Sequence, residues 1–197
     1  MTSRTETLGD IPVSPGIIPI MSLEGHRGAG TTITALSMAL MMKVHSIREE
    51  RDFGVFTDLK FEHADYSSKS IIRQLVSFIP EWLPRPIQDP LPRGVIVLDA
   101  PHLFHEPIGG EPITDNHIRA LLERLAQRRV GLILVCRSGP GELPDPLQDS
   151  LTLTASCRPV KPGREVEVLM RTHNPIRRCR RIFRGLEDLW GMYEAER

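Results

Sequence analysis

The run from Gly25 to Thr32 has the glycine spacing of a loop that binds phosphate. It follows the pattern G-x-x-x-x-G-x-T and comprises Gly25, His26, Arg27, Gly28, Ala29, Gly30, Thr31 and Thr32. Phosphate oxygens must approach backbone N–H groups closely, and glycine permits this because it has no Cβ atom. The pattern predicts that this run binds the phosphates of a nucleotide. It also puts the Thr32 hydroxyl where a Mg²⁺ ligand usually lies.

Such a loop must be positioned by a strand before it and a helix after it. The apolar run 16–23 predicts a buried strand. Residues 31–51 predict a helix, because Ala35, Met38 and Met42 recur at helical spacing. The start of that helix would add partial positive charge at the phosphates. The alternative is a glycine-rich turn that binds nothing.

One position departs from the usual loop. Thr31 occupies the place where a lysine normally stands, so the loop lacks its customary cation. His26 and Arg27 lie inside the loop and are candidates to supply positive charge.

The remaining chain alternates strands and helices, which predicts a Rossmann-like α/β fold with a mainly parallel central sheet flanked by helices. Further strands are expected at 53–59, 94–99, 131–136, 151–157 and 166–170, with helices at 66–79 (capped by Ser67 or Ser68) and 115–129 (capped by Asp115). A proline-rich linker covers 80–92. We expect a flexible leader at 1–15 and a single domain at 16–197, which ends in a basic segment, 158–197.

Composition restricts the classes of function. The 197 residues carry no net charge and only 5% aromatic residues, so contact with nucleic acid requires a local basic patch. Three dispersed cysteines indicate reduced thiols in a cytosolic setting, and the spread histidines argue against a metal site. The polar first ten residues do not resemble a signal peptide. The apolar run 36–42 falls short of the ~20 residues that span a membrane.

Together these segments resemble the FtsK–HerA branch of P-loop ATPases, especially viral DNA-packaging ATPases and zonula-occludens-toxin-like proteins. The resemblance spans about residues 18–196. It rests on the loop, a second strand at 55–59, a Walker B-like segment at 99–104, a strand and turn at 132–140, and a closing tail at 190–194. It implies binding of ATP or another NTP with Mg²⁺, held by Thr32 and Asp99, and assembly into a homo-oligomeric ring.

Three positions depart from that family. Thr31 replaces the Walker A lysine, Ala100 replaces the glutamate that activates water, and Arg137 replaces a glutamine that senses the γ-phosphate. Loss of a cation and of a base should weaken hydrolysis. Substitution by another acid, either Glu106 or Asp58, is the alternative.

Two groups of arginines carry further expectations. By resemblance, Arg128 is the best candidate for an arginine finger or an inter-subunit contact, and it joins Asp99 and Arg137 as a candidate catalytic residue. The alternative is that Arg124, Arg128 and Arg129 form a solvated last turn that complements the helix dipole. Residues 171–184 contain six arginines and no acid. They form either a solvated strand edge or a contact with the DNA backbone through Arg177, Arg178, Arg180 and Arg181.

The favoured function is therefore a nucleotide-binding protein resembling viral DNA-packaging or DNA-translocating ATPases, with hydrolysis weak or lost. It would act in the cytoplasm, or in the host cytoplasm or virion if viral. The main alternative is a non-catalytic structural or regulatory subunit. A small-molecule kinase ranks last, because no acceptor-binding motif or lid is evident.

Overall fold

An eight-stranded mixed sheet forms the centre of the computed structural model, which describes residues 6–8, 11–13, 18–86, 91–173, 176–189 and 193–194. Its strand order is β11-β10-β9-β3-β8-β7-β4-β6. The strands are β3 (Ile20–Glu24), β4 (Gly54–Thr57), β6 (Tyr66–Ser67), β7 (Gly94–Leu98), β8 (Val130–Cys136), β9 (Leu153–Lys161), β10 (Glu165–His173) and β11 (Ile176–Phe183). The β9–β10 and β10–β11 pairs are antiparallel, and every other pair of neighbouring strands in this sheet is parallel. The predicted mainly parallel α/β fold is confirmed.

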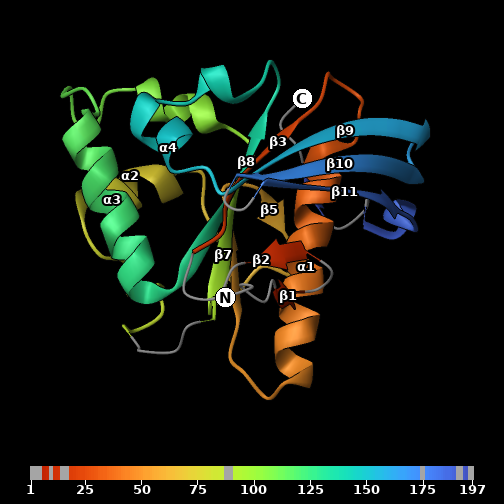
Figure 1. Ribbon diagram of the computed structural model, residues 1–197. Helices are drawn as coiled ribbons and strands as arrows, with labels where there is room; N and C mark the ends of the chain where they lie inside the picture. The colour runs from red at the N-terminus through yellow and green to blue at the C-terminus, as the bar shows by residue number, and fades with distance from the viewer. Residues whose placement is uncertain are drawn as a thin grey trace.

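Helices cover both faces of this sheet (Figure 1). The α-helices are α1 (Thr31–Arg48), α2 (Ile71–Ser77), α3 (Asp115–Arg128) and α4 (Asp145–Asp149), and the 3-10 helices are η1 (Pro101–His105), η2 (Pro140–Glu142) and η3 (Leu186–Leu189). Helix α1 lies against one face, whereas α2, α3 and α4 lie on the other. The sheet is therefore the middle layer of three.

Alternation along the central strands divides the core into two halves. Val95 and Val97 of β7 pack on the α1 side, while Ile96 and Leu98 pack against α2 and α3. All five residues of β7 are buried, as expected of a parallel strand covered on both faces. This packing fixes β3 and β7, whose carboxyl ends carry the predicted loop and Asp99.

The predicted helix at 66–79 is wrong in its first turn. Tyr66 and Ser67 form the edge strand β6 beside β4, and α2 begins only at Ile71 with Ser70 as N-cap. Pairing with the main chain of β4 overrides local helix preference here, because the apolar spacing supports a helix only from Ile71 onward.

The ends of several other helices and strands also differ from those predicted. Helix α3 begins at Asp115 as expected, but its N-cap is Thr114, whose side chain accepts a hydrogen bond from the His117 backbone N–H. Strands β9 and β10 are longer than predicted, and β11 adds an edge strand. Within the expected leader, β1 (Glu6–Leu8) pairs with β2 (Ile11–Val13). Elsewhere, β12 (Tyr193–Glu194), near the end of the chain, pairs with β5 (Lys60–Phe61).

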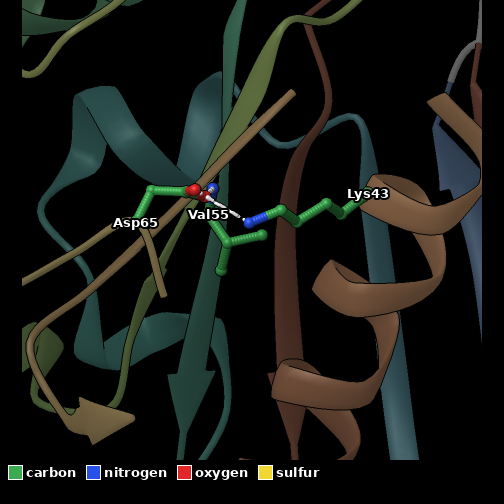
Figure 2. A network of polar contacts seen from close by, with 3 residues as sticks. All are labelled: Lys43, Val55 and Asp65. Carbon is green, nitrogen blue, oxygen red and sulfur yellow. Dashed lines mark hydrogen bonds and ion pairs between the residues drawn. The ribbon is translucent and has the colours of Figure 1, made fainter. Parts of the chain in front are cut away.

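An ion pair connects α1 to the β4 side of the sheet (Figure 2). The Lys43 ammonium lies 2.8 Å from both carboxylate oxygens of Asp65. The same carboxylate accepts a hydrogen bond from the Val55 backbone N–H at 2.7 Å. Asp65 therefore holds α1 and β4 together through one side chain.

Within the part of the chain that the structure describes, no helix has both the length and the apolar character needed to cross a membrane.

Candidate functional site

The loop between β3 and α1 is anchored by its backbone. The Gly25 N–H donates to the Cys136 carbonyl at the end of β8, and the Ala29 N–H donates to the His26 carbonyl at 2.9 Å. Gly28 and Gly30 have φ values of 85° and 80°, a region that side chains with a Cβ rarely adopt. The N-cap of α1 is Gly30, which has no side chain to cap the helix, and no acid lies in the first turn. No side chain therefore occupies the first N–H groups of α1. This is the strand–loop–helix context that phosphate binding requires.

The Thr31 side chain turns into the protein. A Cβ atom placed on Gly25 would lie 2.3 Å from the Thr31 hydroxyl oxygen and 3.5 Å from the Cys157 Cβ. Thr31 is only 6% exposed, and its hydroxyl has no nitrogen or oxygen partner among the described residues. Burial raises the pKa of the neighbouring Cys157 thiol to about 12, despite the hydroxyls beside it. The position of the missing lysine is therefore filled by a buried contact between the loop and β9.

The two predicted Mg²⁺-side residues lie in direct contact. The Thr32 hydroxyl donates a hydrogen bond to the Asp99 carboxylate at 2.5 Å. Strand β8 lies between β3 and β7, so this bond joins the start of α1 to the end of a strand two places away. Both groups present oxygen, the ligand that Mg²⁺ prefers.

Asp58 lies at the same edge, directly after β4. Its carboxylate accepts hydrogen bonds from the Asp99 backbone N–H at 2.9 and 3.0 Å and from the Ala100 N–H at 3.0 Å. Burial raises the pKa of this carboxyl, and the nearby Asp99 charge adds to the rise, while the backbone hydrogen bonds oppose it. Sequence reasoning named Asp58 as a substitute acid but missed that it holds the main chain of the Asp99 segment.

Arg137, the predicted γ-phosphate position, follows β8 at this edge of the sheet. Its backbone N–H donates to Glu142 at 3.1 Å, and the Ser138 N–H donates to the same carboxylate. Burial alone would raise the pKa of Glu142, but these N–H groups lower it below its usual value. The arginine side chain itself is exposed.

Two other candidates lie away from the loop. Arg128 is two residues before β8 and donates to the Pro84 carbonyl at 2.8 Å. It therefore holds the proline-rich linker at the amino ends of the parallel strands, whereas the loop lies at their carboxyl ends. Glu106 lines a surface pocket with residues of α2 and Ile113. The structure does not bring either side chain to the loop within one chain.

The β10–β11 register places the four predicted DNA-binding arginines on two opposite faces of the sheet, two on each. Arg177 and Arg181 pair with Thr172 and Val168, on the α1 side of the sheet. Arg178 and Arg180 occupy the opposite side, called the open face below. Its exposed residues on β9, β10 and β11 include Arg158, Leu169, Arg171, His173, Ile176, Arg178, Arg180 and Ile182.

Among the described residues, no group of three or more His, Cys, Asp or Glu side chains is arranged to hold a metal ion. The three cysteines, Cys136, Cys157 and Cys179, are free, and the first two are buried.

No family model matches the sequence, and no curated protein matches it. The fold, however, matches solved structures of P-loop ATPases. The N-terminal domain of zonular occludens toxin from Neisseria meningitidis has a TM-score of 0.56 at 14% identity, covering 90% of this chain and 100% of that one. The DNA-packaging ATPase of Sulfolobus turreted icosahedral virus has a TM-score of 0.51 at 10% identity, covering 84% and 97%.

A KaiC-like protein from Pyrococcus horikoshii matches with a TM-score of 0.51 at 13% identity, covering 94% of this chain and 97% of that one. Identities this low show the fold alone. The chain therefore has the P-loop NTPase fold, and its glycine loop connects β3 to α1.

Proposed function

We propose that this chain binds ATP or another nucleoside triphosphate with Mg²⁺ at residues 25–32 and hydrolyses it slowly or not at all. The observation that carries the proposal is the 2.5 Å contact between Thr32 and Asp99 beside a helix start that no side chain caps. Two oxygen groups at this distance fit Mg²⁺, which protein sites usually hold through one or two carboxylates together with substrate phosphates. The ion would neutralise charge on the phosphates when bound.

Slow hydrolysis is supported by what surrounds this pair. Thr31 contributes no cation and is turned inward, and Ala100 contributes no base. The Asp58 carboxylate is engaged by two consecutive backbone N–H groups rather than free to accept a proton from water. Each missing electrostatic group typically lowers an enzymatic rate by about 10²–10³-fold.

Calorimetric titration with Mg-ATP, run beside a phosphate-release assay, tests both halves of the proposal. We expect binding with turnover near background. Asp99→Asn should reduce the Mg²⁺ dependence of binding, and Thr31→Lys with Ala100→Glu should raise turnover. Absence of binding at millimolar Mg-ATP would refute the site, whereas turnover of ~1 s⁻¹ or faster would refute the loss of catalysis.

A DNA-packaging or DNA-translocating role is the second candidate, supported by the open face. Arg171 and Arg178 lie directly opposite each other on neighbouring strands. Like charges in this arrangement are destabilising. Neither guanidinium has a carboxylate partner among the described residues. A phosphate backbone would relieve that repulsion, without reading sequence.

The two faces of the same hairpin provide matched variants. Arg171→Ala with Arg178→Ala should weaken binding to a generic duplex and lower the slope of affinity against salt by roughly two units. Arg177→Ala with Arg181→Ala removes as much charge from the α1 side and should have a smaller effect. Fluorescence anisotropy from ~50 mM salt upward measures both pairs. Equal losses, or no affinity in the unaltered protein, would refute a contact through the open face.

The alternative is a non-catalytic structural or regulatory subunit, which predicts nucleotide binding without DNA-stimulated turnover. Assembly into a ring and a finger role for Arg128 in a neighbouring subunit stay predictions. Light scattering with and without Mg-ATP measures the assembly state. Arg128→Ala should lower any turnover measured in the assembled state without affecting nucleotide affinity.

A further inference from the structure

The β9–β10 hairpin extends beyond the level of the loop. Glu24, the last residue of β3, pairs with Ser156 of β9. Strand β9 then continues for five residues, to Lys161, before the chain turns back. At about 3.3 Å per residue, the hairpin tip stands roughly 15 Å past the point where β3 becomes the loop. Its turn therefore lies beyond the carboxyl end of β3, the end from which the loop begins.

The hairpin also packs directly on the loop. A Cβ atom placed on Gly30 would lie 2.7 Å from a methyl carbon of Val166, near the start of β10. Cys157 of β9 similarly lies beside Gly25. The hairpin thus contacts the first and the last glycine of the loop, which fixes the position of its tip relative to the loop.

That tip is basic. Glu165 pairs with Lys161 at 2.9 Å and lies 3.9 Å from Arg184. Arg164 is exposed, and no carboxylate contacts it among the residues that the structure describes. Its N–H donates to the Lys161 carbonyl, and its own carbonyl accepts from the buried Leu186 N–H. The backbone of Arg164 is therefore held, while its guanidinium has no carboxylate partner in the described part of the chain.

The geometry points to Arg164 as a residue that contacts the phosphates of the bound nucleotide, from outside the loop. It lies two residues, or about 7 Å of extended chain, from the Val166 contact with Gly30. The loop itself has Thr31 turned inward at the usual lysine position. A guanidinium can bind phosphate oxygens with two parallel hydrogen bonds, which suits a cation that reaches in from a neighbouring strand. This inference rests on the nucleotide binding proposed above.

Titration of three variants with Mg-ATP and with adenosine tests it. Arg164→Gln should weaken ATP binding by about 10–100-fold, as loss of a charge-assisted hydrogen bond does, and leave adenosine binding unchanged. Arg164→Lys should retain most of the ATP affinity. Arg48→Gln, an exposed arginine at the end of α1 that lies farthest from the loop, should bind both ligands as the unaltered protein does. Thermal unfolding of each variant establishes that all are folded.

The outcomes separate the two proposals. If the unaltered protein binds ATP and Arg164→Gln matches its affinity within about twofold, or loses no more affinity than Arg48→Gln, the role of Arg164 is wrong while nucleotide binding stands. Equal loss of ATP and adenosine binding would place the contact on the nucleoside and also refute the inference. No ATP binding by the unaltered protein would refute both proposals together.

Discussion

Replacing Asp58 with alanine tests how the carboxyl edge of the sheet is held. The change removes three N–H···O contacts of 2.9–3.0 Å to the backbones of Asp99 and Ala100. These backbones are half-buried, so each lost contact should cost about 1 kcal/mol, and the sum is roughly 2–3 kcal/mol. For a domain of this size, that lowers the melting temperature by roughly 4–12 °C.

The loss should also depend on pH, because burial raises the pKa of Asp58 in the folded chain. Between the ordinary pKa of 3.8 and the raised pKa of the folded chain, the unfolded chain has released a proton that the folded chain retains. The stability that Asp58 contributes is thus greatest below this pH and falls as pH rises through the raised pKa. The slope can reach about 1.4 kcal/mol per pH unit.

Urea unfolding of the unaltered protein and Asp58→Ala at intervals from pH 4 to 8 measures this difference. We expect the gap between their free energies of unfolding to narrow as pH rises and then to level off. The free energy of unfolding of Asp58→Asn should lie between those of the unaltered protein and Asp58→Ala, because its amide oxygen accepts one N–H while its NH₂ group opposes another. A gap that widens with pH would mean that the hydrogen bonds outweigh burial, and would refute this reasoning.

Two other predictions concern stability. Gly30→Ala forces a side chain to φ 80° and against Val166, so it should destabilise the fold by roughly 2 kcal/mol or more and abolish nucleotide binding. Gly28→Ala, at φ 85° with open space, should lose only about 1 kcal/mol in thermal unfolding, and equal losses would refute the Val166 contact. Lys43→Ala should lower stability by under ~1 kcal/mol, whereas Asp65→Ala should lower it by about 1–3 kcal/mol, because it also leaves the Val55 N–H unpaired. Comparable losses in chemical unfolding would contradict that order.

Local patterns account for the parts of the fold that the sequence predicts correctly. The glycine spacing at 25–32 and the continuous apolar run at 94–98 each carry their signal within a few residues, so the loop and β7 follow from sequence. Asp99 follows too, because its position is set by the end of β7. The structure then brings its carboxylate to the Thr32 hydroxyl, while Mg²⁺ binding by the two groups stays a prediction that came from the resemblance.

Features set by distant partners were not predictable in the same way. The pairing of Tyr66 with Phe56 turns an expected helical turn into a strand. The bonds from Arg128 to the linker depend on the path of residues 83–84, which no local spacing encodes. The division of the basic segment between two faces requires the β10–β11 register. Alternation along a strand shows only that neighbouring side chains lie on opposite faces of the sheet, and it does not show which face each one takes.

The position of β3 in the middle of the sheet has a consequence for how the chain folds during synthesis. Its two neighbours are β8 and β9, so Met21 pairs with Ile133 and Leu153. Over 110 residues separate it from either partner. At about 5–20 residues per second, the ribosome would release β3 several seconds or more before β9 exists. Until then this buried apolar strand has no place in a sheet, so the loop that follows it cannot acquire its final shape. Truncated chains ending before residue 150 should therefore bind chaperones or aggregate rather than bind nucleotide.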